Sequence, residues 1–184
     1  MRQMDYIRQS LGEDEELVHV AHFHWFYTLS AVLNIIFGVG LAIAIIVGAI
    51  MVQPWLPAFL QSDIPPDAGM LDMIRSVSPG IKILAFMVLA MGLLRYAQMM
   101  IIKATTEIAI TNKRLVYKRG LIARYVGEMN IDRIEGVNVL QGVWGRIFNY
   151  GRIMVRGMGV GEVVLPSIED PIKFRKAIEK ARSV

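Results

Sequence analysis

The chain has 184 residues, a formal net charge of +4 and no cysteine, which excludes disulfides, thiolate metal sites and cysteine nucleophiles. Hydrophobic residues make up 54% of the sequence, more than most soluble domains contain. Two long runs hold most of this excess, and the remaining length suffices for one small globular domain.

The first 25 residues form an acidic segment ahead of the first apolar run. Residues 13–16 are consecutive carboxylates, which we interpret as a solvated turn after a short helix. Residues 17–23 alternate partly between apolar and polar side chains, which favours a strand. We expect this strand to join a sheet formed later in the chain. Trp25 and Tyr27 are typical of the aromatic belt at a membrane interface.

Two runs are long enough to cross a bilayer. No charged residue occurs between Trp25 and Ser62, and residues 29–52 are almost wholly apolar. Residues 83–102 form a second run with a single charge, Arg95. A helix needs roughly 20 apolar residues to cross the hydrocarbon core. The sequence therefore predicts a transmembrane hairpin over residues 26–103, with spans at 30–51 and 81–102 and an outer loop at 53–80.

The distribution of basic residues predicts the orientation of this hairpin. From Lys103 to the end there are 15 Lys and Arg against 8 Asp and Glu, whereas the outer loop holds Arg75 as its one basic residue. Short cytoplasmic flanks are enriched in Lys and Arg. We therefore expect a multi-pass membrane protein with both termini in the cytoplasm.

After Lys103 the pattern changes from helical to strand-like. Six strand candidates follow in residues 104–184, at 106–111, 115–119, 123–129, 134–140, 152–156 and 162–165. Asp170 and Pro171 are a favourable N-cap and first residue for a C-terminal helix with one apolar face. Short antiparallel strands followed by one helix are the order of elements in a pleckstrin-homology-like (PH-like) domain, and the segment before the hairpin would supply a seventh strand.

Several short motifs in this order resemble a known family. They are Thr105-Thr106-Glu107, Thr111-Asn112-Lys113-Arg114-Leu115, Lys118-Arg119-Gly120-Leu121-Ile122, Asp132-Arg133-Ile134-Glu135, Gly145-Arg146-Ile147-Phe148-Asn149-Tyr150-Gly151 and Asp170-Pro171, with Gly12-Glu13 and His24-Trp25 ahead of the first span. The chain resembles bacterial membrane proteins in which a PH-like domain follows a two-helix hairpin. The resemblance implies an α+β fold: a two-helix transmembrane hairpin plus an antiparallel β-sandwich or barrel capped by a C-terminal helix. It also implies a location in the bacterial inner membrane, but no particular activity.

The sequence offers little for catalysis, cofactors or metal binding. His19, His22 and His24 are candidate metal ligands, but a strand would place His19 on the opposite face from the other two. We find no nucleophile elbow, phosphate-binding loop or zinc-protease motif. We therefore expect a non-enzymatic protein with no cofactor, no metal, no small-molecule substrate and no nucleic-acid partner.

Two features of the spans predict helix contacts. Gly40, Ala44 and Gly48 follow the spacing that lets membrane helices approach closely, either within the hairpin or between protomers. Arg95 lies roughly 10 Å inside the cytoplasmic end of its span, at a depth similar to that of Asn34. We expect Arg95 to extend toward the membrane surface, with a hydrogen bond to Asn34 as one possibility, rather than to line a transport path.

The first hairpin of the C-terminal domain is the candidate lipid site. It carries five basic residues, Lys113, Arg114, Lys118, Arg119 and Arg124. Beside an anionic leaflet each basic residue adds about 1 kcal/mol of attraction.

The sequence thus favours a membrane-anchored interaction or scaffold module that binds protein partners or its own copies at the cytoplasmic face. Binding of anionic lipid headgroups through residues 113–124 is the alternative, and a small transporter or metal-handling protein is a weaker one. Membrane lipids and a protein partner or homo-oligomer are the expected partners.

Overall fold

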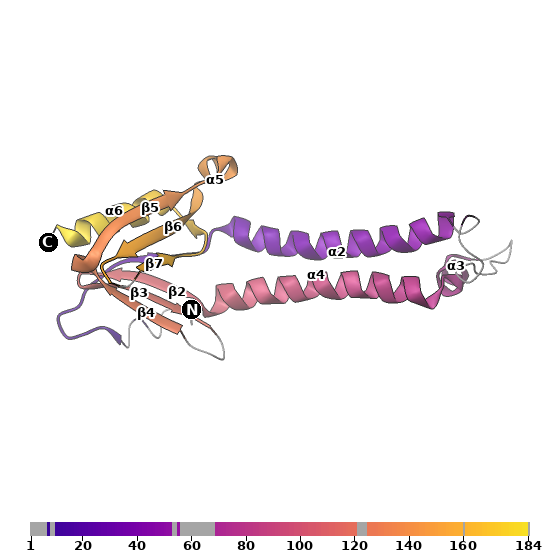
Figure 1. Ribbon diagram of the computed structural model, residues 1–184, viewed down its shortest axis with the longest axis horizontal. Helices are drawn as coiled ribbons and strands as arrows, with labels where there is room; N and C mark the ends of the chain where they lie inside the picture. Colours follow the sequence, from indigo (N-terminus) through magenta and orange to yellow (C-terminus); the bar gives the residue numbers. More distant parts are fainter. Residues whose placement is uncertain are drawn as a thin grey trace. The chain divides into compact units, whose positions relative to one another are not determined.

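The computed structural model describes residues 7, 10–52, 55, 69–120, 125–159 and 161–183, and the chain divides into two compact units (Figure 1). One unit comprises Met1–Thr28 and Met100–Val184, and the other comprises Leu29–Met99. The first unit is therefore assembled from two segments that flank the second in sequence. Residues 1–6 and most of the predicted outer loop lie outside the described residues.

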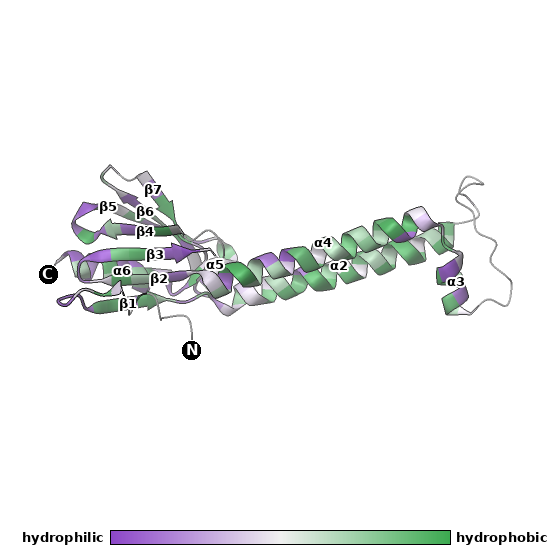
Figure 2. Cartoon of the chain, turned by 90° about the horizontal axis from the view of Figure 1, so that it is seen from below, coloured by the Kyte–Doolittle hydropathy of each residue, from purple (hydrophilic) through white to green (hydrophobic). Residues whose placement is uncertain are grey.

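The second unit contains all but the first four residues of the long helix α2 (Trp25–Val52), all but the last six of α4 (Pro79–Thr105), and the short α3 (Met70–Ser76). Both long helices are apolar almost throughout (Figure 2). They approach each other through small residues: a Cβ added to Gly92 would lie 3.0 Å from the carbonyl oxygen of Asn34 and 3.3 Å from the Cα of Gly38. Ala31 and Ala85 are also buried.

The first unit contains two antiparallel sheets. The first sheet has the order β1 (Leu17–Ala21), β2 (Glu107–Thr111), β3 (Arg114–Arg119) and β4 (Tyr125–Asn130). The second has the order β5 (Ile134–Leu140), β6 (Tyr150–Gly157) and β7 (Gly161–Val164), and β8 (Ile168–Glu169) also pairs with β6. The 3₁₀ turn η3 (Ile131–Arg133) connects the sheets, and α5 (Val143–Ile147) lies between β5 and β6.

The core of this unit lies between the two sheets and α6 (Pro171–Arg182). Phe174 and Ile178 of α6 are fully buried with Ile108 and Ile110 of β2 and Ile153 of β6. The periodicity of residues 171–182 predicts one apolar face for this helix, and α6 buries the face that carries Phe174 and Ile178.

Asp170 occupies the N-cap position of α6, but its side chain makes no capping hydrogen bond. Its backbone is left-handed (φ 46°), and its carboxylate instead accepts a hydrogen bond from the Asn149 side chain. Asp170 therefore occupies the expected N-cap position, but the expected capping hydrogen bond from its side chain is absent. The carboxylate instead links α6 to the loop between α5 and β6.

The segment before the helices belongs to the first sheet. In the antiparallel pairing of β1 with β2, Val20 lies opposite Ala109 and Ala21 lies opposite Ile108. After β1 the chain crosses to the second sheet, where the His22 carbonyl accepts a hydrogen bond from the Glu169 amide at 2.9 Å. The expected participation of residues 17–23 in the later sheet is thus observed.

The acidic turn that precedes β1 is not solvated throughout, because the side chain of Glu15 is only 4% exposed. Its carboxylate accepts hydrogen bonds from Arg114 Nε and Nη2, both at 2.8 Å, and from the Thr111 hydroxyl at 2.7 Å. Burial alone raises the pKa of Glu15, but these hydrogen bonds outweigh it and lower the pKa to about 2. Arg114 also pairs with Glu128 at 2.6 Å, so the N-terminal turn is tied to β3 and β4.

We predict that Glu15→Gln destabilises the first unit by roughly 1–3 kcal/mol at neutral pH, because it removes the charge from several hydrogen bonds. The lowered pKa means that this stabilisation is complete above about pH 4.5 and is lost as the pH falls toward 2. Thermal unfolding of the full chain in detergent should therefore show a gap between wild type and variant that closes on acidification. The exposed neighbour substitution Glu13→Gln is the control, and an equal effect of both would contradict the assignment.

Candidate functional site

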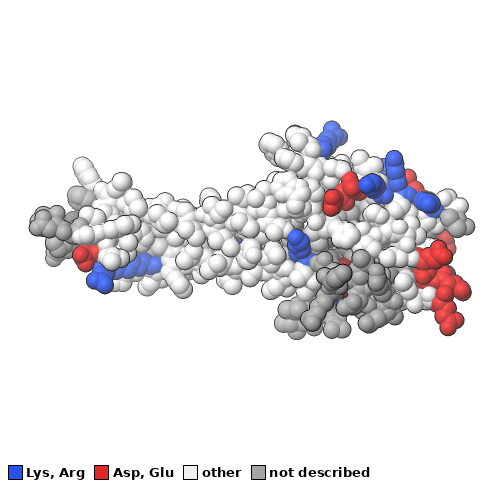
Figure 3. Space-filling model, turned by 180° about the vertical axis from the view of Figure 1, so that it is seen from behind, with Lys and Arg blue, Asp and Glu red and all other residues white. Residues whose placement is uncertain are grey.

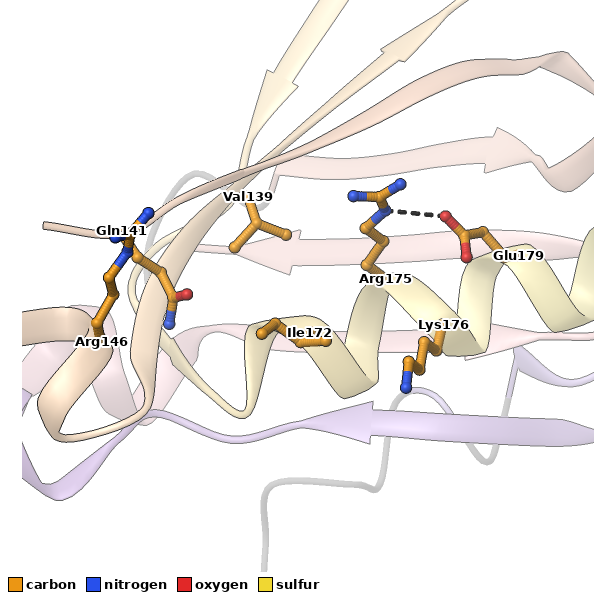
Figure 4. Close-up of a pocket in the computed structure, with 7 residues that line it drawn as sticks. All are labelled: Val139, Gln141, Arg146, Ile172, Arg175, Lys176 and Glu179. Atoms are coloured by element: carbon orange, nitrogen blue, oxygen red, sulfur yellow. Dashed lines mark hydrogen bonds and ion pairs between the residues drawn. The ribbon is translucent and has the colours of Figure 1, made fainter.

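A pocket of about 440 Å³ opens between β5, α5 and α6 (Figure 4). It is lined by Val139, Gln141, Arg146, Ile172, Arg175, Lys176 and Glu179. Val139 and Ile172 lie between the Gln141–Arg146 end and the Arg175–Glu179 end (Figure 4). The pocket thus combines an apolar centre with charged ends, an arrangement typical of binding sites.

The charges of this pocket are unbalanced. Arg175 Nε donates to Glu179 at 2.8 Å, which neutralises one cation. Within the described part of the chain, Arg146 and Lys176 form no ion pair. Both are exposed, so the pocket presents two cations that are available to an anionic group.

One wall of the pocket is the edge of a sheet. β5 pairs with β6 on one side, and among the described residues no strand pairs with its other side. Asn138 and Leu140 are exposed along this strand, and Val139 between them lines the pocket. A free edge offers backbone donors and acceptors to another extended chain.

The α5 loop is held in shape by Gln141. Its side-chain amide donates to the carbonyl oxygens of Gly145 at 3.2 Å and Tyr150 at 3.1 Å, which closes the loop on itself. Gly145 fits only without a side chain, because a Cβ there would lie 2.6 Å from the Tyr150 carbonyl oxygen. Gly151 is equally confined, with the Leu140 carbonyl oxygen 3.0 Å from an added Cβ. These close approaches explain why glycine occupies both positions 145 and 151 of the motif.

The comparison with family models agrees with this architecture. The model described as the bacterial PH domain matches residues 20–182, which includes the end of β1, both long helices and all later strands. The chain belongs to the bacterial PH domain family. Comparisons with curated proteins and with solved structures find no match.

The PH-like domain does not bring the predicted basic hairpin together as one site. Arg114 is occupied by Glu15 and Glu128, and Lys118 pairs with Glu107 at 3.0 Å. Lys113 and Arg119 are exposed but lie at opposite ends of β3. Arg124 lies outside the described residues. Lipid binding by residues 113–124 stays a prediction. Among the four of these basic residues that the structure describes, Lys113 and Arg119 are exposed and separated from each other.

The three histidines of the PH-like domain have separate surroundings. His24 is buried, stacks on Tyr150 with ring centroids 5.2 Å apart, and caps α2 by accepting a hydrogen bond from the Phe26 amide at 3.2 Å. The ring of His19 meets Phe174 edge-on, and His22 is exposed. The described residues include no group of three His, Cys, Asp or Glu that could hold a metal ion.

Within the hairpin, the residues predicted to form helix contacts do not make the contacts that the sequence suggested. The Asn34 amide donates to the Ser30 carbonyl at 2.7 Å and to the Met99 sulfur at 3.8 Å, so the expected bond to Arg95 is absent and Arg95 is exposed. A Cβ added to Gly40 or Gly48 would meet nothing within 4 Å. Ala44 is exposed as well. Contact within the hairpin uses Gly38 and Gly92 instead, and a contact between protomers through the predicted residues stays a prediction.

Sequence reasoning missed the pocket of the PH-like domain. Its cations come from two separate elements, Arg146 from α5 and Arg175 and Lys176 from α6. The available signal was the 145–151 motif, whose two glycines mark a tightly packed loop.

We predict that Gly145→Ala destabilises the PH-like domain by about 1–3 kcal/mol, because the methyl group would force the loop away from Tyr150. Gly142→Ala is the matched control, since an added Cβ at Gly142 meets nothing within 4 Å and its φ of −75° suits alanine. Thermal unfolding of both full-length variants in detergent checks this. Equal melting temperatures would contradict the close approach at Gly145.

Proposed function

We propose that the protein is a membrane-anchored interaction module: α2 and α4 hold it in the bacterial inner membrane, and its PH-like domain binds an extended acidic segment of a partner protein along β5. The observation that carries the binding proposal is the edge of β5, which no described strand covers, beside a pocket with two cations that form no ion pair with any described residue. No catalytic role is proposed.

The exposure of the two long helices supports the membrane anchor. α2 and α4 have 28 and 27 residues, about 40 Å each, which exceeds the roughly 30 Å of a hydrocarbon core. A core helix of a soluble protein buries its apolar side chains, whereas Phe37 of α2 is 72% exposed and Leu94 of α4 is 70% exposed. The visible face along these helices is almost free of charge (Figure 3). A bilayer would cover this surface.

Strand addition explains how β5 would contribute. An extended peptide laid along a sheet edge gains main-chain hydrogen bonds, while pockets for alternate side chains give selectivity. The centre formed by Val139 and Ile172 would take an apolar side chain, and Arg146 and Lys176 would attract carboxylates on either side. The expected partner is therefore an acidic strand with an apolar residue in its middle. A second copy of this chain is the alternative occupant.

Site-specific photo-crosslinking in native membranes tests the binding proposal. A photoreactive residue at Asn138, on the exposed side of β5, should capture one partner, and mass spectrometry should locate the crosslink in an acidic stretch. The same probe at Glu162 on β7 is the positional control. A crosslink to a second copy of the chain would favour self-association, and an absence of any crosslink specific to Asn138 would refute the proposal.

Charge reversal then isolates the contribution of the pocket. We predict that Arg146→Glu with Lys176→Glu reduces this crosslink at least severalfold, because it replaces two attractive charges by two repulsive ones. Lys180→Glu with Arg182→Glu, in the last turn of α6 and outside the pocket, changes the net charge equally. The prediction fails if the two double variants crosslink alike.

The membrane anchor predicts an orientation that thiol labelling can read, because the chain contains no cysteine. Ser62→Cys, which lies between α2 and α3 in the sequence, should react with an impermeant maleimide in intact spheroplasts. Ser183→Cys should react only after lysis, because the C-terminus is expected in the cytoplasm. The opposite pattern would reverse the topology.

A further inference from the structure

We infer that α5 is a second membrane contact, through which the PH-like domain inserts apolar side chains into the interfacial region of the bilayer. This inference rests on the proposed membrane anchor. It does not depend on the peptide site at β5.

The surface of α5 is unusually apolar for a loop. Val143 is 75% exposed, and Trp144 and Ile147 are each 63% exposed. Val143 and Ile147 are four residues apart, as are Trp144 and Phe148, so these side chains form two adjacent rows on a single helical turn. Adjacent exposed residues of this size mark an interaction surface, unlike single apolar residues scattered over a domain.

This surface continues into the start of the first long helix. The Trp144 ring stacks on Phe148 at 6.1 Å, and Phe148 meets Trp25 edge-on at 5.8 Å. Phe148 also stacks on Phe26 at 5.9 Å. Trp25 and Phe26 are the first two residues of α2, so these rings join α5 to the point where α2 begins.

That continuity identifies the occupant as lipid. If α2 spans the bilayer, its first turn lies at the interface, and side chains within ring-contact distance of Trp25 lie at nearly the same depth. Tryptophan is enriched at this level, where its ring meets both acyl chains and headgroups. Arg146 lies between the apolar residues in sequence and is exposed, which suits anionic headgroups. Interfacial helices of this kind bury their apolar face roughly 5–10 Å into the headgroup boundary.

Fluorescence quenching by brominated lipids tests the inference on the full chain, which contains three tryptophans. Trp25→Phe with Trp55→Phe leaves Trp144 as the reporter, and Trp55→Phe with Trp144→Phe leaves Trp25. For a control, all three tryptophans are replaced by phenylalanine and Met158→Trp is added. Met158 is 59% exposed and follows the end of β6 that is remote from α5. Each protein is placed in vesicles of phosphatidylcholine and phosphatidylglycerol.

We expect the Trp144 reporter to be quenched about as strongly as the Trp25 reporter, most by bromines close to the headgroup, while the Met158→Trp reporter is unaffected. If Trp25 is quenched and Trp144 is not, the anchor holds and this inference is wrong. If Trp25 itself is unquenched, the anchor fails and the inference fails with it. Shielding of Trp144 from aqueous acrylamide without quenching by lipid would place a protein, such as a second copy, on α5.

A second measurement avoids substituting any tryptophan. Val143→Cys in this cysteine-free chain accepts a polarity-sensitive fluorophore at the most exposed large apolar residue of α5. Its emission should shift to the blue on transfer from mild detergent to anionic vesicles, whereas the same label at Met158→Cys should not change. Equal responses of the two labels would overturn the inference.

Discussion

The pairing of β1 with β2 is the constraint on which the architecture depends. The two strands are neighbours in the sheet, yet the whole helical unit lies between them in sequence. Because Ala21 lies opposite Ile108, the start of α2 and the end of α4 leave the sheet from the same end. The Glu15–Arg114 ion pair and the bond from the Glu16 amide to the Asn112 side chain fix the other end of this pair. The cost of closing so long an insertion rises only slowly with its length, and the contact of Gly38 with Gly92 holds the helices antiparallel.

Local sequence patterns were sufficient to predict most helices and strands of this fold, but not which side chains pair over long distances in the sequence. The alternation in residues 134–140 gave the bounds of β5, and Pro171 marked the first residue of α6. The role of Arg114 was beyond such reasoning, since its partner Glu15 is 99 residues away in the sequence and Lys113 beside it is also basic. The hairpin therefore looked like a basic cluster, whereas long-range pairing neutralises part of it. Five helical residues in α5 are too few to show a period, so this element and the pocket beside it were missed.

The α5 loop links the two proposed contacts of the PH-like domain. Arg146 lines the pocket beside β5, while its neighbours Trp144 and Ile147 are exposed and apolar. The loop is short and braced by Gln141, so these side chains cannot move far apart. A partner bound along β5 would consequently lie close to the membrane surface. The proposed interaction is thus one that assembles proteins at the bilayer rather than one that reaches into the cytoplasm.

Charge alone would orient the PH-like domain poorly. The potential of an anionic leaflet falls off over a Debye length of about 8 Å. Lys113 directly precedes β3 and Arg119 ends it, so the two are separated by the length of the strand, roughly 20 Å. They cannot both lie within a Debye length of the membrane if β3 is steeply inclined to it. Lys118 lies opposite Glu107, which follows the end of α4 by two residues, so the end of β3 with Arg119 is the one near the last residue of α4. Lys113 at the other end would then add little attraction. If α2 and α4 span a bilayer as proposed, orientation would therefore rest on contacts of short range, namely the two helix ends held together by β1 and β2 and the apolar turn of α5 beside Trp25.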